Sequence, residues 1–155
     1  MDQAIWIHRQ VGPHPRRDIY LSVSTSARNE NFLNLELACV ASLKHGKPLW
    51  TILLSSWWQY FRTPSAGELR WWVYGALAYG LKGFGYFTYW PARDDYVAVV
   101  DYQGNETPLY SVIRDVNSET LAMGATLLQL KSTAVFNTGA TIPEGCKRLP
   151  ADASV

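Results

Sequence analysis

The residues best suited to chemistry in this sequence are flat aromatic side chains in two short segments. Trp57, Trp58 and Tyr60 follow one apolar run, and Tyr89 and Trp90 end another. The chain of 155 residues holds 7 Trp, 9 Tyr and 5 Phe. Aromatic faces stack well on flat ligands, so these five residues are candidate substrate-binding residues. The alternative is ordinary packing in the core or in a pocket wall.

Few acidic residues accompany these aromatic segments. Glu30 precedes a predicted helix, where a helix dipole stabilises a carboxylate without any catalytic role. Asp94 and Asp95 follow Trp90, and for them the alternative to catalysis is a solvated loop position. Glu30, Asp94 and Asp95 are therefore the candidate catalytic residues, and none of them is assigned the role.

The sequence holds no recognisable set of metal ligands. Cys39 and Cys146 are too few for a disulfide framework, and neither has a metal-ligand spacing around it. The three histidines form no closely spaced pair. We therefore predict no metal and no cofactor.

The composition limits the function classes. With 14 Lys+Arg against 13 Asp+Glu, the net charge of +1 gives no attraction to phosphate backbones or anionic membranes. We predict neither a nucleic-acid nor a membrane partner, and no apolar run reaches 18 residues. The first residues lack the pattern of a signal peptide, which leaves the localisation of a longer parent protein open. Apolar residues make up 48% of the chain, enough for a folded core.

Three apolar segments are predicted to be strands. Residues 19–24 alternate apolar and polar side chains, residues 49–55 form a nearly continuous apolar run, and residues 83–89 carry glycines at alternate positions. Further short strands are predicted over residues 96–101 and 133–137.

Helices are predicted between these strands. Residues 31–45 have helical apolar spacing and end before Gly46. A capping box from Ser65 to Glu68 opens the next helix, and Thr107 followed by Pro108 opens the last. Alternation of strands and helices with short connections indicates an α/β fold with parallel strands.

Two stretches, residues 64–90 and 100–118, resemble the last part of the catalytic (β/α)8 barrel of glycoside hydrolases. The nearest resemblance is to the β-galactosidase-like family 42 and related uncharacterised bacterial proteins. The first stretch fits with Glu68, Arg70, Ala76, Leu77, Ala78, Gly80, Lys82, Gly83, Tyr86, Phe87 and Trp90. The second fits with Asp101, Gly104, Thr107, Pro108 and Tyr110.

This resemblance implies that residues 19–24, 49–55 and 83–89 are strands six, seven and eight of a TIM barrel. A complete barrel needs eight strands and about 250 residues, so the chain would hold about the last three β/α units. The expected organisation is a loop or tail over 1–18, a partial barrel over 19–135 and a C-terminal tail over 136–155. The expected partners are carbohydrate and either the missing N-terminal part of the barrel or another copy.

The resemblance also implies a site at the carboxyl ends of the strands. Its nucleophile would be a Glu that ends strand seven, but here that strand ends in Leu54, Ser55 and Ser56. The acid/base residue would follow strand four, upstream of this chain. The expected function is therefore part of a glycoside hydrolase acting on a β-galactoside or related polysaccharide. The alternative is a non-catalytic carbohydrate-binding barrel or an inactive fragment, and the chain alone is expected to be inactive.

Overall fold

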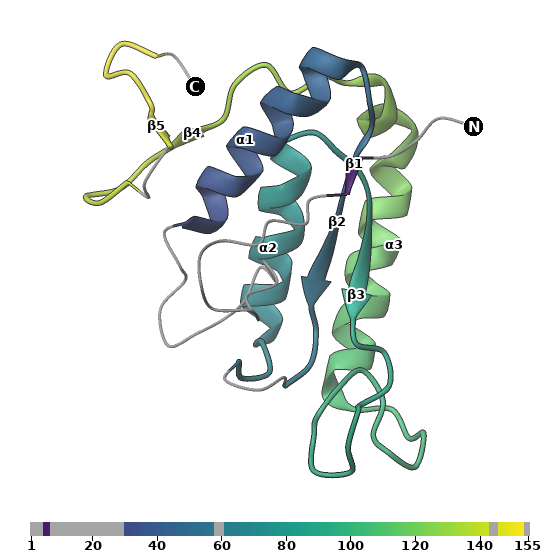
Figure 1. Cartoon of the computed structure of the whole chain (residues 1–155). Helices are drawn as coiled ribbons and strands as arrows, with labels where there is room; N and C mark the ends of the chain where they lie inside the picture. Colours follow the sequence, from purple (N-terminus) through teal and green to yellow (C-terminus); the bar gives the residue numbers. More distant parts are fainter. Residues whose placement is uncertain (1–4, 7–29, 58–60, 143–145, 154–155) are drawn as a thin grey trace, which may run out of the picture.

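The computed structural model describes residues 5–6, 30–57, 61–142 and 146–153 (Figure 1). A core of parallel strands and helices is followed by a small second sheet. The elements in chain order are β1 (Ile5–Trp6), α1 (Glu30–His45), β2 (Leu49–Leu54), α2 (Ala66–Ala78), β3 (Leu81–Phe87), α3 (Pro108–Gln129), β4 (Phe136–Asn137) and β5 (Lys147–Arg148).

The main sheet confirms the prediction of an α/β fold with parallel strands. Its order is β1-β2-β3, and both neighbouring pairs are parallel. The strand predicted over residues 19–24 lies outside the described residues. Ile5–Trp6, within a stretch that the sequence predicts as loop, pairs with β2 in parallel.

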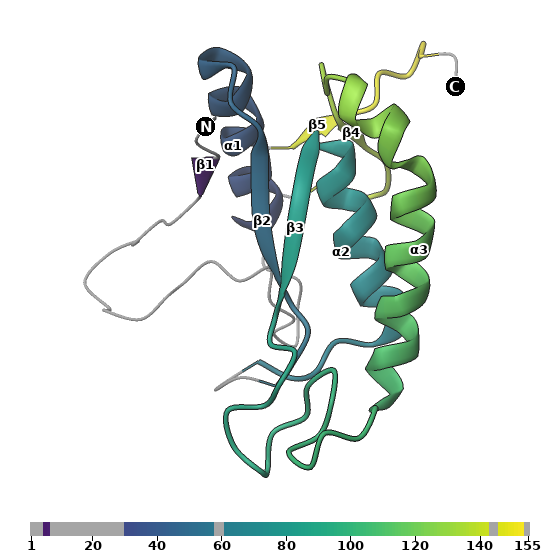
Figure 2. The same ribbon diagram turned by 90° about the vertical axis from the view of Figure 1, so that its right-hand side faces the viewer.

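The helices are arranged on one side of the sheet (Figures 1 and 2). Helices α1 and α2 lie against one face, and α3 lies beside α2 along the β3 edge. No helix of the described residues covers the opposite face, where Trp50 and Ile52 are exposed. The barrel itself stays a prediction, because β1, β2 and β3 form an open sheet of three strands.

The core lies between the sheet and the helices. Leu49 and Leu53 of β2 are buried against Trp72 and Val73 of α2, and Phe32 of α1 joins the same cluster. The apolar residues that recur at helical spacing in the sequence are therefore the residues that fill this core.

Local capping signals set the helix ends. Ser65 caps α2, and the reciprocal hydrogen bonds between Ser65 and Glu68 confirm the predicted capping box. Thr107 caps α3, with Pro108 in its first turn. Trp71 of α2 is partly exposed, and its ring packs edge-on against Phe32 with the ring centroids 5.1 Å apart.

The strand predicted over residues 96–101 does not form. In this segment Val100 makes an isolated bridge to Glu106, and its N–H donates to the Tyr89 carbonyl. Ala98 and Val99 are buried all the same. The apolar run therefore packs as a buried loop. Its backbone groups form hydrogen bonds with Tyr89 and with the turn that follows, and not with a neighbouring strand.

The segment predicted as a C-terminal tail contains a second sheet. Strands β4 and β5 pair in parallel, and Lys147 of β5 forms an ion pair with Glu36 of α1 at 2.8 Å. Of the strand predicted over residues 133–137, only Phe136–Asn137 is extended and paired.

Candidate functional site

The loops that leave the carboxyl ends of β2 and β3 meet at one edge of the sheet, because the two strands are parallel. The β2 chain continues through Ser55 and Ser56, both fully buried. The Ser55 N–H donates to the Phe87 carbonyl at 2.7 Å, and the Ser56 hydroxyl donates to the same carbonyl at 3.1 Å. The Ser56 hydroxyl also accepts from the Thr88 N–H at 3.0 Å. The two serines therefore tie the loops together.

A first aromatic pair follows β2. The ring centroids of Trp57 and Tyr96 are 5.1 Å apart, and the backbone N–H of Trp57 donates to the Val97 carbonyl at 2.8 Å. Arg93 lies over the Tyr96 ring at 5.4 Å and forms an ion pair with Asp95. This pair therefore joins the loop after β2 to the loop after β3.

A second aromatic pair follows β3. The ring centroids of Trp90 and Tyr102 are 6.4 Å apart, and the ring edge of Trp90 borders Gly104. The turn that holds Tyr102 is fixed by Asp101, whose carboxylate accepts from the Asn105 side-chain amide at 2.9 Å and from the Asn105 N–H at 2.8 Å. These hydrogen bonds hold the pKa of Asp101 below its usual range.

These indoles combine contact with exposure. Trp57 is 39% exposed and Trp90 is 49% exposed, so one part of each ring packs on the protein and the rest faces solvent. We refer to Trp57, Trp90, Tyr96 and Tyr102 as the aromatic rim. Tyr96 and Tyr102 were not among the residues singled out in the sequence. The sequence signal that could have identified these two tyrosines is their position in the connection that follows β3.

Tyr89 is not part of either aromatic pair. Its side chain borders a cavity of about 560 Å³ between β3 and α3, with Tyr86 and Tyr110. The Tyr86 hydroxyl donates to the Asn117 amide oxygen at 2.8 Å, and burial raises the pKa of Tyr86 to about 12. Tyr89 therefore belongs to the wall of a groove rather than to either aromatic pair.

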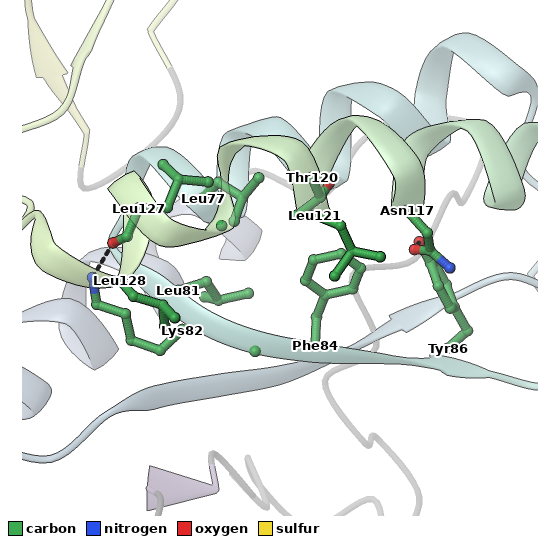
Figure 3. A pocket seen from close by; sticks show the side chains of 12 residues that line it. Leu77, Leu81, Lys82, Phe84, Tyr86, Asn117, Thr120, Leu121, Leu127 and Leu128 are labelled. Carbon is green, nitrogen blue, oxygen red and sulfur yellow. Dashed lines mark hydrogen bonds between the residues drawn. The ribbon is translucent and has the colours of Figure 1, made fainter.

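This groove continues along β3 as a second cavity of about 480 Å³ (Figure 3). Its walls are apolar: Phe84 and Leu81 come from β3, while Leu121 and Leu128 come from α3. We refer to the two cavities together as the β3–α3 groove.

The candidate acids do not form a catalytic centre among the described residues. Asp94 is exposed, and Asp95 is also exposed and engaged by Arg93. Glu30 begins α1, but its side chain lies outside the described residues, as do Trp58 and Tyr60. The position at which the resemblance implies a nucleophile holds Ser55 and Ser56, whose hydroxyls are already hydrogen-bonded.

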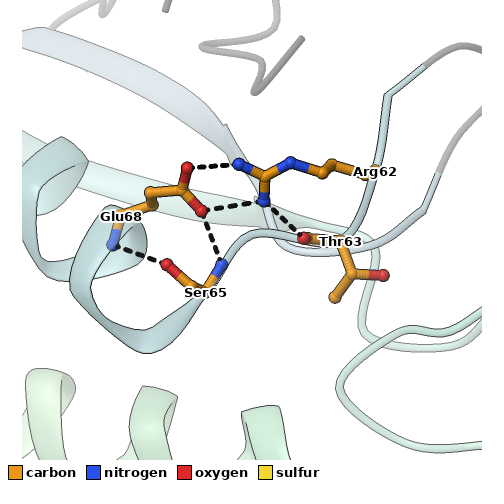
Figure 4. A network of polar contacts seen from close by, with 4 residues as sticks. All are labelled: Arg62, Thr63, Ser65 and Glu68. Carbon is orange, nitrogen blue, oxygen red and sulfur yellow. Dashed lines mark hydrogen bonds and ion pairs between the residues drawn. The ribbon is translucent and has the colours of Figure 1, made fainter. Parts of the chain in front are cut away.

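The loop between β2 and α2 is anchored by a polar network (Figure 4). Arg62 donates from both terminal nitrogens to the Glu68 carboxylate, and the Ser65 N–H donates to the same group at 2.9 Å. The hydrogen bond from Arg62 is the main cause that lowers the pKa of Glu68 to about 2. Arg62 therefore fixes the segment that leads directly into α2.

The described ranges hold neither a cluster of metal ligands nor a membrane-spanning helix. No three His, Cys, Asp or Glu residues in these ranges come together as a group that could hold a metal ion. No helix in the same ranges has both the length and the apolar character needed to cross a bilayer.

The chain matches no model of a known protein family, and no curated protein sequence matches it. The residues of the aromatic rim and the groove therefore carry the functional argument.

Proposed function

We propose that this chain is part of a (β/α)8-barrel glycoside hydrolase and that its aromatic rim binds the carbohydrate. One observation carries the proposal: Trp57 and Trp90, both partly exposed, lie on the loops that leave the carboxyl ends of two parallel strands. The carboxyl ends of the strands are where barrel enzymes bind their substrates.

The chemistry of the rim suits a sugar. Indole and phenol faces cover the C–H face of a pyranose ring, and the polar tips of tyrosines hydrogen-bond its hydroxyls. The rim also holds an Arg93–Asp95 pair that reaches solvent and offers further donors and acceptors. A β-linked galactoside or related polysaccharide is the proposed ligand, on the basis of the family resemblance.

In this proposal the chain contributes binding, and the catalytic carboxylates come from elsewhere in the complete enzyme. Glycoside hydrolysis usually requires two carboxyl groups that flank the scissile bond. Two described acids near the rim are engaged in their own loops, Asp95 with Arg93 and Asp101 with Asn105, while Asp94 is exposed. The isolated chain is therefore proposed to bind glycan without cleaving it.

A second candidate is a carbohydrate-binding barrel without catalytic activity. It is favoured by Ser55 and Ser56, which replace the implied nucleophile and serve as buried links to the Phe87 and Thr88 carbonyls. The coding sequence upstream separates the two candidates. An Asn-Glu pair at the end of a predicted fourth strand would support hydrolysis, whereas its absence would support binding alone.

Isothermal titration of the chain with β-linked galacto-oligosaccharides tests the binding proposal. The control variant is Phe136→Ala, which removes a similarly exposed aromatic ring from β4, outside the rim. We expect Trp90→Ala to weaken binding and Phe136→Ala to leave it unchanged. Equal effects of the two variants, or no binding by the unaltered chain, would contradict the proposal.

A further inference from the structure

The lysines and arginines of the described residues fall into two groups. One group forms ion pairs with carboxylates and consists of Arg62, Arg70, Arg93, Arg114 and Lys147. The other group has no carboxylate partner among the described residues and consists of Lys44, Lys47, Lys82, Lys131 and Arg148. Three members of this second group, Lys47, Lys82 and Lys131, line one cavity of about 440 Å³. The cations that the described fold leaves without a carboxylate are therefore gathered mainly at one place.

This cavity lies at the end of the molecule opposite the aromatic rim. Lys47 stands two residues before β2 and Lys82 is the second residue of β3, whereas the rim follows the carboxyl ends of these strands. Figure 1 shows the ends of α1 and α3 at the same end of the molecule as the starts of β2 and β3. No Asp or Glu is among the described residues that line the cavity. Its described lining therefore carries positive charge and no negative charge.

Lys82 has a structural role in this cavity. Its ammonium group donates to the carbonyls of Leu127 and Leu130 at 2.5 Å, as Figure 3 shows for Leu127. These carbonyls belong to the end of α3, where a cation stabilises a helix. Because this role accounts for Lys82, the case for a ligand depends on Lys47 and Lys131.

Lys47 and Lys131 stand on backbone segments that are held in place. The Ser42 hydroxyl donates to the Lys47 carbonyl at 2.5 Å, and the Lys47 N–H donates to the Ser42 carbonyl at 3.1 Å. The hydroxyl of Ser132, next to Lys131, donates to the Ala78 carbonyl at 2.6 Å. Lys47 is also half-buried, so part of its side chain leaves water without a carboxylate to compensate. Two such cations on fixed segments favour a bound anion, since little ordering is left for binding to impose.

We propose that this cavity binds a phosphate group, either as the free ion or carried by a small organic molecule, through Lys47 and Lys131. A lysine ammonium group is a common ligand of phosphate because it acts as a concentrated positive charge. The volume of the cavity lies within the range of small-molecule sites, about 300–1,000 Å³, and Leu43, Pro48 and Leu128 give it an apolar wall for an organic group. This site goes beyond the proposed carbohydrate binding and does not depend on it.

Calorimetric titration of the 155-residue chain with inorganic phosphate and with glycerol 3-phosphate, at constant ionic strength in chloride, tests the proposal. Glycerol is the uncharged control for the second probe. We expect both anions to bind and glycerol not to bind. Tighter binding of glycerol 3-phosphate than of inorganic phosphate would assign the site to an organic phosphate, and equal affinities would assign it to the free ion.

Single substitutions separate the cavity from a general attraction to anions. Lys47→Gln and Lys131→Gln each remove one lining charge, and we expect each to weaken phosphate binding by about fivefold or more. The matched control is Lys44→Gln, which removes the same charge from the same end of α1 but is exposed and outside the lining. Because salt screens a more distant charge, this control should change the affinity by less than about twofold.

Circular dichroism shows whether each variant is folded, and the exposed position of Lys131 lets Lys131→Gln test the site even where Lys47→Gln does not fold. Absence of phosphate binding by the unaltered chain would overturn the proposal. Equal weakening by Lys131→Gln and Lys44→Gln would overturn it as well, because it would indicate only attraction to the basic end of the molecule.

Discussion

The anchor of the loop before α2 should make stability depend on pH in a predictable direction. Glu68 accepts hydrogen bonds from Arg62 and from the Ser65 N–H, and its pKa is lowered to about 2. A carboxyl group whose pKa is lowered by folding stabilises the fold above its unfolded pKa, near 4.5. That stabilisation is lost as the pH falls from 4.5 to about 2. Replacing Glu68 with Gln removes the charge while keeping an acceptor for the capping box.

The expected magnitude is modest because the pair reaches solvent. Arg62 is 51% exposed and Glu68 is 30% exposed, so the ion pair contributes about 0.2–1 kcal/mol to the free energy of unfolding. Ser65→Ala removes the cap acceptor instead and should cost about 1 kcal/mol. For a chain of this size, 1 kcal/mol corresponds to a change of about 2–4 °C in melting temperature.

Urea unfolding followed by circular dichroism gives the free energy of unfolding, and it is measured once near neutral pH and once near pH 2. We expect Glu68→Gln to be less stable than the unaltered chain at neutral pH and equally stable near pH 2. Ser65→Ala should lose a similar amount at both values. A deficit of Glu68→Gln that stays constant with pH would refute the assignment of the lowered pKa to the Arg62 contact.

The remaining predictions concern the rim and the core. Trp90→Ala should weaken glycan affinity by about 1–3 kcal/mol, or roughly 5- to 150-fold, measured by calorimetric titration. Gly83→Ala should destabilise the chain by about 1–3 kcal/mol, because its Cβ would lie 2.6 Å from the Trp50 indole. Gly85→Ala, whose Cβ meets no atom within 4 Å, is the matched control and should be neutral or slightly stabilising in the same urea assay. Leu53→Ala removes a fully buried side chain and should cost about 2–5 kcal/mol, so a loss below 1 kcal/mol would contradict the described core.

The helices were predictable because their signals are local. The predicted helix over 31–45 agrees within one residue with α1, Glu30–His45. Ser65, Glu68 and Thr107 cap their helices as the sequence indicates, since each side chain bonds to a backbone group only two or three residues away. Such contacts need no knowledge of the rest of the fold.

The predictions that were wrong depend on contacts between residues that are far apart in the sequence. Residues 96–101 have the composition of a strand, but a strand also needs a neighbour, and here the Val100 N–H bonds to Tyr89. Tyr89 itself was grouped with Trp90 because they are adjacent in sequence, although its side chain lines the β3–α3 groove. Strand β3 ends at Phe87, so Tyr89 and Trp90 stand in the bend that follows it, and their sequence adjacency does not put them on one surface.

The composition of β2 links the open sheet to the barrel proposal. Leu49 and Leu53 of β2 are buried beneath the helices, while Trp50 and Ile52 on the opposite face are equally apolar yet exposed. A strand that is apolar on both faces is typical of parallel sheets covered on both sides. The helices of the described residues cover only one side, and the strand order advances without reversal from β1 to β3. A sheet of this kind can bury its second face by closing on itself or by packing against a further layer of helices or strands.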